Sequence, residues 1–168
     1  TKTSLVLRTC AKDGTSHNNF KWPLKVGAVV TCPDWKDNKE CGNGLHGLLD
    51  GAGDGSLLNW GADAVWMVLS VETKSIVMLG GKCKFPTAKI LFIGDRKGAT
   101  DYLIANGAKA ENVVGAFLTV GDNATVSGGY RATVSGGYMA TVSGGDRATV
   151  SGGEGATVSG GYRATVSG

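Results

Sequence analysis

A glycine-rich segment, residues 40–55, carries most of the side chains that could do chemistry. It reads Glu-Cys-Gly-Asn-Gly-Leu-His-Gly-Leu-Leu-Asp-Gly-Ala-Gly-Asp-Gly. Cys41 and His46 could form a nucleophile and its general base, and a lone histidine could contact a ligand. No acidic residue is spaced to orient His46, so we interpret the pair first as buried residues of a turn-rich segment. Cys41 and His46 stay as weak catalytic candidates. The candidate ligand-contacting residues of the segment are His46, Asp50 and Asp54.

The same segment fits neither of the two common glycine-rich ion sites. A phosphate-binding loop needs Gly-x4-Gly-Lys-Ser/Thr, and no lysine follows these glycines. A calcium loop that starts at Asp50 would have Ala52 and Gly61 where oxygen ligands are required. The four cysteines include no Cys-x2-Cys pair, which argues against zinc. We therefore predict no metal ion and no cofactor.

Composition narrows the classes of partner. The formal net charge of +3 is too small for a strongly basic nucleic-acid-binding protein. No apolar run approaches the ~20 residues of a membrane span, and the N-terminal apolar stretch is too short for a signal peptide. The sequence therefore predicts a cytoplasmic protein that binds neither membrane nor nucleic acid. Trp35 is the aromatic residue expected to contribute to a binding surface.

From Gly121 to Gly168 the chain repeats one octad six times without an insertion. The octad is Gly-[Tyr/Asp/Glu]-x-Ala-Thr-Val-Ser-Gly. Its β-branched residues between glycine pairs predict a short strand between corners, with the Gly-Gly pairs supplying the backbone angles of the corners. Alternation along a strand points Ala and Val inward and Thr and Ser outward. The expected outward residues are Thr125, Ser127, Thr133, Ser135, Thr141, Ser143, Thr149, Ser151, Thr157, Ser159, Thr165 and Ser167.

Two closures suit an eight-residue step. Two octads could form one 16-residue coil, so that six octads make about three coils of a flat β-solenoid, stacked at about 4.8 Å. Alternatively, three chains could intertwine as a triple-stranded β-helix. We favour the single-chain solenoid, because the intertwined form needs larger apolar side chains at its axis. Tyr130, Tyr138 and Tyr162 share one octad position and are expected to contact a partner or a second copy of the chain.

The first 120 residues have the pattern of a compact α+β domain. A helix is predicted over residues 97–105, with Gly107 as its stop, and a shorter helix over 57–60. Strands are predicted from alternating or continuous apolar runs at residues 4–8, 26–30, 64–71, 75–78, 89–93 and 113–120. The predicted domains are residues 1–120, the α+β domain, and 121–168, the β-solenoid.

Three resemblances follow from these motifs. The two-octad coil resembles the 16-residue repeats of bacterial ice-nucleation proteins, and its triplet is Thr133-Val-Ser135. Val134-Ser-Gly136 is similar to the Val-x-Gly octads of contractile-phage spikes. The run Cys41-Gly-Asn-Gly-Leu-His-Gly47, with Leu57-Leu-Asn-Trp60, resembles an uncharacterised bacterial and prophage family in which such a domain precedes octapeptide repeats. That family implies a mobile-element setting and transfers no catalytic residue.

The prophage resemblance leads to the first functional hypothesis. It implies a non-enzymatic phage-type accessory protein in the cytoplasm of a bacterial host. The α+β domain would bind a host protein or protein complex, as an inhibitor of a host defence system for example, and the solenoid would be a scaffold or an oligomerisation surface. One alternative is a nucleotide- or NAD-directed enzyme that uses the Cys41–His46 loop. The other is a structural protein, either a phage fibre component or an ice-interacting protein.

Overall fold

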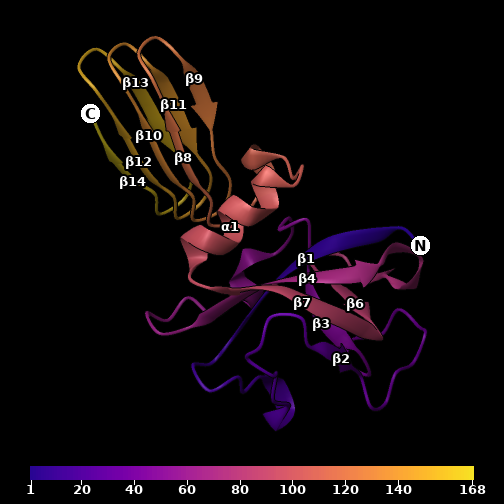
Figure 1. Ribbon diagram of the computed structural model, residues 1–168. Helices are drawn as coiled ribbons and strands as arrows, with labels where there is room; N and C mark the ends of the chain where they lie inside the picture. Colours follow the sequence, from indigo (N-terminus) through magenta and orange to yellow (C-terminus); the bar gives the residue numbers. More distant parts are fainter. The chain divides into compact units, whose positions relative to one another are not determined.

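The computed structural model describes all 168 residues as two compact units, Thr1–Leu103 and Ile104–Gly168. The N-terminal unit is an antiparallel sheet of seven strands in the order β2-β7-β4-β1-β3-β6-β5 (Figure 1). Its strands are β1 Thr3–Cys10, β2 Val29–Thr31, β3 Leu45–Leu49, β4 Val65–Glu72, β5 Val77–Met78, β6 Cys83–Phe85 and β7 Thr87–Gly94.

The centre of this sheet is buried. Strand β1 pairs along its whole length with β4, where Val6 lies opposite Leu69. Both are fully buried, and they pack in one apolar cluster with Trp22, Phe85 and Ile90. The continuous apolar run of β4 therefore reflects a central strand that is covered on both faces.

The predicted helix is α1, Arg96–Ala105, and it buries Ala99 and Leu103. The Tyr102 ring contacts the Phe92 ring of β7 at a tilt of 41°, with 6.0 Å between the ring centroids. None of the helices combines the length and the apolar character that a transmembrane helix requires. Short 3₁₀ turns complete the helical elements: η1 His17–Asn19, η2 Gly55–Leu57, η3 Thr73–Ser75 and η4 Ala110–Asn112.

Several predicted elements differ from the observed ones. The helix predicted at 57–60 is the 3₁₀ turn η2, and the strand predicted at 113–120 begins only at Phe117. Strand β3 was not expected, because its sequence Leu-His-Gly-Leu-Leu lies among turn-forming glycines. Gly47 of β3 is required by close packing, since a Cβ there would clash with Val6 Cγ1 and lie 2.8 Å from the Leu7 carbonyl oxygen. This glycine therefore belongs to a strand in the interior of the sheet and not to a turn.

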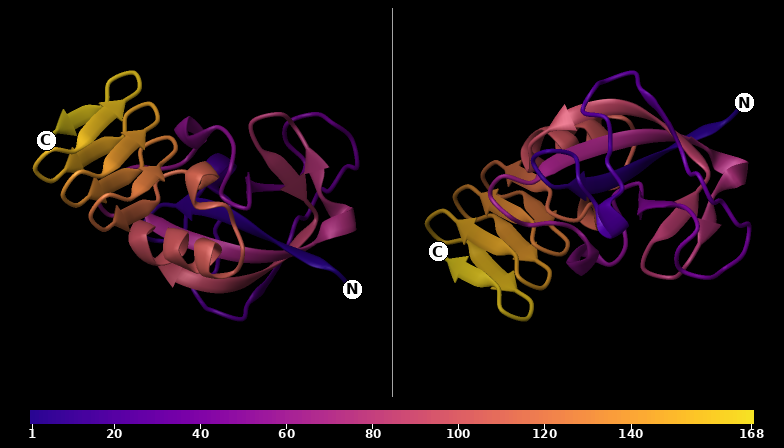
Figure 2. Two further views of the ribbon diagram at one scale, coloured as in Figure 1. Left: turned by 90° about the horizontal axis from the view of Figure 1, so that it is seen from above. Right: turned by 90° about the horizontal axis from the view of Figure 1, so that it is seen from below.

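The C-terminal unit is a β-solenoid whose coils are closed within one chain, which confirms the predicted single-chain fold (Figure 2). Its parallel strands form two sheets, in the orders β14-β12-β10-β8 and β13-β11-β9. One coil takes 16 residues, so that Thr133 lies beside Thr149 and Thr141 beside Thr157. The strands are β8 Phe117–Val120, β9 Thr125–Ser127, β10 Thr133–Gly136, β11 Thr141–Gly144, β12 Thr149–Gly152, β13 Thr157–Gly160 and β14 Thr165–Ser167.

The interior of the middle coils holds only small side chains. The Ala and Val positions of the middle octads are at most 1% exposed: Ala132, Val134, Ala140, Val142, Ala148 and Val150. The Ala and Val side chains of each of these octads therefore point inward, as predicted. The interior is so narrow that nothing larger than valine lies in these coils.

The sequence predicted that the Gly-Gly pairs supply the backbone angles of the corners, and this prediction is wrong. The residue with a left-handed φ is the third of each octad, at φ between 53° and 75°: Asn123, Arg131, Met139, Arg147, Gly155 and Arg163. The paired glycines do not have positive φ; they are needed for space instead. A Cβ at Gly136 would lie 2.5 Å from Val142 Cγ2, and one at Gly145 would lie 2.9 Å from the carbonyl carbon of Gly129.

The turns lie on two long edges. Turns at residues 121–124, 137–140 and 153–156 form the first edge, and turns at 129–132, 145–148 and 161–164 form the second edge. On each edge a backbone N–H of one turn donates to a carbonyl of the next coil, as Asn123 does to Tyr138 and Arg131 to Asp146. The octad is thus the sequence repeat, whereas 16 residues are the structural repeat.

Candidate functional site

Strands β9, β11 and β13 present a regular array of hydroxyl groups, which we name the β9–β11–β13 face. Parallel pairing in register aligns one row of threonines and one row of serines across the three coils. Adjacent coils are spaced by about 4.8 Å, and the two rows by about 6.6 Å along the strand. The rows are Thr125, Thr141 and Thr157, and Ser127, Ser143 and Ser159.

The hydroxyls of this face are available to water. Its three threonines are exposed, and none of its six hydroxyl groups hydrogen bonds to another protein group. Strand β11 pairs with β9 on one side and with β13 on the other, and this pairing holds its side chains in fixed positions. The face therefore offers donors and acceptors, with threonine methyl groups between them, at positions set by the backbone ladder.

The opposite sheet, the β8–β10–β12–β14 face, is less regular. In its first strand Phe117 lies in the threonine row beside Thr133, and Thr119 in the serine row beside Ser135. The Thr119 and Ser135 hydroxyls are 3.2 Å apart and hydrogen bond to each other. Residues 113–120, Val-Val-Gly-Ala-Phe-Leu-Thr-Val, are thus a degenerate octad. The spacing from Ala116 to Gly121 equals that from Ala132 to Gly137, and it is the signal that could have placed Thr119 on this face.

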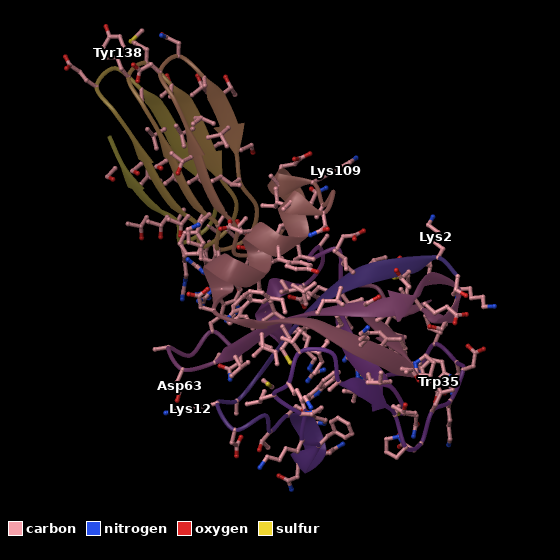
Figure 3. The ribbon with its side chains drawn as sticks, viewed as in Figure 1. Lys2, Lys12, Trp35, Asp63, Lys109 and Tyr138 are labelled. Atoms are coloured by element: carbon pink, nitrogen blue, oxygen red, sulfur yellow. The ribbon has the colours of Figure 1, made fainter.

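The tyrosines lie at the corners and not on either face. Tyr138, on the first edge, is 53% exposed and lies at the turn between β10 and β11 (Figure 3). Tyr130 and Tyr162 lie on the second edge, where Tyr162 is 67% exposed and Tyr130 half-buried. Asp122 and Asp146 accept the backbone N–H of Tyr138 and Tyr162, at 2.9 and 2.8 Å, and so tie successive coils together. Binding of a partner through the tyrosines stays a prediction.

Cys41 and His46 lie near one hollow of the N-terminal unit but do not form a pair. No hydrogen bond joins the thiol to the imidazole; His46 Nε2 accepts the Gly42 N–H at 3.4 Å, and Cys41 Sγ lies 3.1 Å from Lys82 Nζ. Cys41 is exposed and His46 half-buried, whereas both were expected to be buried. Burial, followed by the nearby Lys82 and Arg8, lowers the pKa of His46 to about 4. The imidazole is therefore neutral at pH 7.

The other predicted binding residues, Trp35, Asp50 and Asp54, interact with neighbours in their own parts of the domain. Trp35 is half-buried, with Lys84 Nζ 5.4 Å from its ring centroid (Figure 3). Asp50 has a left-handed φ of 53° in the turn after β3. Asp54 caps η2, where its Oδ1 accepts hydrogen bonds from the backbone N–H and the hydroxyl of Ser56. Trp35, Asp50 and Asp54 do not converge with His46 on one centre, and no cluster of His, Cys, Asp and Glu could hold a metal ion.

Comparison with protein families assigns the N-terminal unit. A family model described as a domain of unknown function (DUF7666) matches residues 4–105. The chain belongs to this family. The DUF7666 domain thus includes the sheet and α1, and the motif Cys41 to Gly47 lies within it. No solved structure matches the chain.

The curated relatives of this DUF7666 chain are named ice nucleation proteins. One from Xanthomonas campestris pv. translucens is 42% identical over 104 residues, which is 61% of this chain and 6% of the relative. One from Pseudomonas syringae pv. syringae is 36% identical over 118 residues, 69% of this chain and 10% of the relative. InaU from Pantoea ananas is 37% identical over 106 residues, 62% of this chain and 10% of the relative. The chain thus spans about a tenth or less of the length of these relatives.

These relatives confirm the resemblance to ice-nucleation repeats and correct the functional prediction. The phage accessory protein, with its role as an inhibitor of host defence, is wrong for this DUF7666 chain. That hypothesis depended on the N-terminal motif alone, whereas the similarity to ice nucleation proteins covers well over half of the chain. The cytoplasmic location, predicted because the sequence shows no membrane span and no signal peptide, is contradicted by the same relatives.

Proposed function

We propose that this chain is a non-enzymatic structural protein that contacts ice or ice-like water through its solenoid. The observation that carries the proposal is the in-register array of exposed hydroxyls on the β9–β11–β13 face. The names of the curated relatives support the same class of function.

The physical argument begins with rigidity. A surface can order water only if its own polar groups hold fixed, repeating positions, since the entropy lost by each bound water must be offset by well-placed hydrogen bonds. In the solenoid the rows repeat because the strands pair in register: Val142 packs inside, which directs Thr141 and Ser143 outward. Each added coil extends the array without changing its spacing.

The β9–β11–β13 face is favoured over the opposite face for two reasons. All three of its threonines are exposed, whereas Thr133 of the opposite face is half-buried. In addition, the first row of the opposite face holds Phe117, and the hydroxyls of Thr119 and Ser135 are used for a hydrogen bond between themselves. The β9–β11–β13 face has no such interruption.

The experiment compares two matched variants in the middle of each face. Thr141→Lys and Thr149→Lys change the same octad position in an exposed residue of an interior strand. We expect the full chain to raise the freezing temperature of supercooled droplets, or to change the shape of growing ice crystals, relative to buffer. Thr141→Lys should remove the effect because a long charged side chain breaks the flat array, and Thr149→Lys should retain it.

Circular dichroism checks that both variants keep the β-structure of the parent chain. The proposal is wrong if the parent chain alters neither freezing nor crystal shape. The choice of face is wrong if Thr149→Lys, and not Thr141→Lys, removes the effect.

A further inference from the structure

A guanidinium without an acidic partner lies inside the N-terminal unit. Arg8 of β1 donates from Nη1 to the His46 carbonyl at 2.7 Å, and its Nε is buried with no hydrogen-bond partner. Its guanidinium carbon lies 4.6 Å from the centroid of the Trp22 ring. The ion pairs of this unit are Lys74–Glu72 and Lys97–Asp101, so none involves Arg8. Burial lowers the pKa of Arg8 to about 10, which leaves it charged at pH 7.

A second buried cation lies close by. Lys84 of β6 is fully buried, opposite His46 of β3. Its Nζ donates to Asn38 Oδ1 at 2.8 Å and to the Gly42 carbonyl at 3.3 Å, again with no carboxylate. Buried charges are costly unless an opposite charge offsets them. The acidic residue nearby, Asp34, lines an adjoining hollow, where its carboxylate accepts hydrogen bonds from Cys32 Sγ and Asn43 Nδ2 and forms no ion pair with either cation. The region around His46 therefore has more positive than negative charge.

This charge borders a cavity of about 570 Å³. Arg8, His17, His46 and Lys82 line it, and no acidic residue does. Leu57 and Leu58 form an apolar part of its wall, and Leu57 is 53% exposed there. Pockets for small ligands have roughly 300–1,000 Å³ and combine apolar walls with a few polar groups. The volume and the lining both fit a small molecule.

We propose that this cavity binds a small molecule with a terminal oxyanion, either a carboxylate or a phosphate. The oxyanion accepts hydrogen bonds from the Arg8 guanidinium and from Lys82 Nζ, while the apolar part of the molecule packs on Leu57 and Leu58. A planar guanidinium matches the geometry of both oxyanions, and charge-assisted hydrogen bonds of this kind are about twice as strong as neutral ones. The proposal concerns binding only and is independent of the solenoid and its function.

The test titrates the full chain with two probes, inorganic phosphate and hexanoate. The readouts are tryptophan fluorescence, to which Trp22 contributes, and the imidazole NMR signals of His46. His46 lines the cavity, and Trp22 lies beneath the Arg8 guanidinium in the adjoining hollow. We expect at least one probe to bind saturably with one site per chain. The His46 signal should then titrate at a higher pH, because a bound anion stabilises the imidazolium. A stronger response to hexanoate identifies an organic carboxylate as the ligand class, and a stronger response to phosphate identifies a phosphate.

Variants distinguish the cavity from general attraction of anions to a basic protein. Lys82→Ala, at a half-buried position of the cavity wall, should weaken binding at least fivefold. Lys89→Ala, an exposed lysine of β7 that does not line the cavity, should leave binding unchanged. If Arg8→Gln folds, it should abolish binding. The proposal is overturned if neither probe saturates, or if Lys82→Ala and Lys89→Ala have the same effect.

Discussion

The sheet of the N-terminal unit and the coils of the solenoid both depend on β-ladders, but they fill their interiors differently. In the sheet, antiparallel strands bring together distant residues such as Val6 and Leu69, and large side chains such as Trp22 and Phe85 fill the space. In the solenoid, parallel strands bring together residues 16 apart, and the fully buried side chains of its core are alanine and valine alone. The wide core of the sheet is stable only if large side chains fill it. The narrow solenoid is stable only if the paired glycine positions at its corners carry no side chain.

This difference predicts which kind of substitution destabilises each unit. Loss of side-chain volume leaves a cavity in the wide interior, because the surrounding structure relaxes only partly. Gain of one methyl group forces atoms apart in the narrow interior, where glycines already lie against neighbouring side chains and backbone. Four predictions test this comparison.

The largest expected effect is a truncation in the sheet. Leu69→Ala, at a fully buried position of β4, should lower the free energy of unfolding of the N-terminal unit by about 3 kcal/mol. All four tryptophans lie within residues 1–103, so tryptophan fluorescence during urea unfolding reports this unit. Leu57→Ala, at an exposed position, is the control and should change the urea midpoint little. Equal shifts for the two variants would contradict the assigned core.

The next effect is a single added methyl group in the solenoid. Gly144→Ala places a Cβ 2.6 Å from Ala148 Cβ and 2.7 Å from Val150 Cγ2, and should destabilise the solenoid by about 2 kcal/mol. Gly121→Ala is the matched control, because nothing lies within 4 Å of the added atom. Thermal unfolding followed by circular dichroism compares the two variants. If both unfold like the parent chain, the corners are less tightly packed than described.

A smaller effect concerns backbone conformation at the corners. Arg147 has a φ of 59°, which β-branched residues adopt poorly and asparagine adopts readily. Arg147→Val should therefore be less stable than Arg147→Asn, by about 1–2 kcal/mol. At Lys89, an exposed strand position of β7, the order should reverse, since valine suits a strand and asparagine does not. The same order at both positions would contradict the left-handed corner.

The smallest effect is the pH dependence caused by His46. Its folded pKa is about 4 and its ordinary value 6.5, so the unfolded chain binds more protons between these two values. This contribution to stability is full above pH 6.5 and is lost as the pH falls toward 4. Since His46 is half-buried and partly screened, the loss should be about 1 kcal/mol. After burial, the charged groups that lower the pKa of His46 are Lys82, Arg8 and Lys84, and His17 has the smallest effect.

His46→Gln should remove this part of the pH dependence, and His17→Gln, at an exposed position, should retain it. Urea midpoints measured between pH 7 and pH 4 give the slope for each variant. Identical slopes for His46→Gln and the parent chain would show that the imidazole is not desolvated as described.

The solenoid was the more predictable unit because each of its interactions is repeated in the sequence. Alternation in Ala132-Thr-Val-Ser135 determines which side chains point inward, and the fixed octad length determines the coil. The corners were not predictable in this way. Glycine at Gly136 signals either a left-handed φ or a lack of space, and only the positions of Val142 and Ala140 decide between them.

The N-terminal unit was predictable in its longest strands and its helix, where apolar runs are continuous. Strand β3 was missed because its pairing with β1 and β6 depends on residues far along the chain. The cavity was missed for the same reason: Arg8, His46 and Lys82 come from three separate segments, and no local pattern connects them. Repeated local contacts can be inferred from a sequence, whereas single contacts between distant segments cannot.

Successive turns lie on alternate edges of the solenoid, and their charged side chains give it an electric dipole. The first edge holds the carboxylates of Asp122 and Glu154 and no basic side chain. The second edge holds three guanidinium groups and one carboxylate: Arg131, Arg147, Arg163 and Asp146. The array is neutral as a whole, yet it has a dipole that runs across its width, parallel to both faces. Beside a charged surface, this dipole favours one rotational setting of the solenoid about its long axis, and so determines which way the hydroxyl rows face.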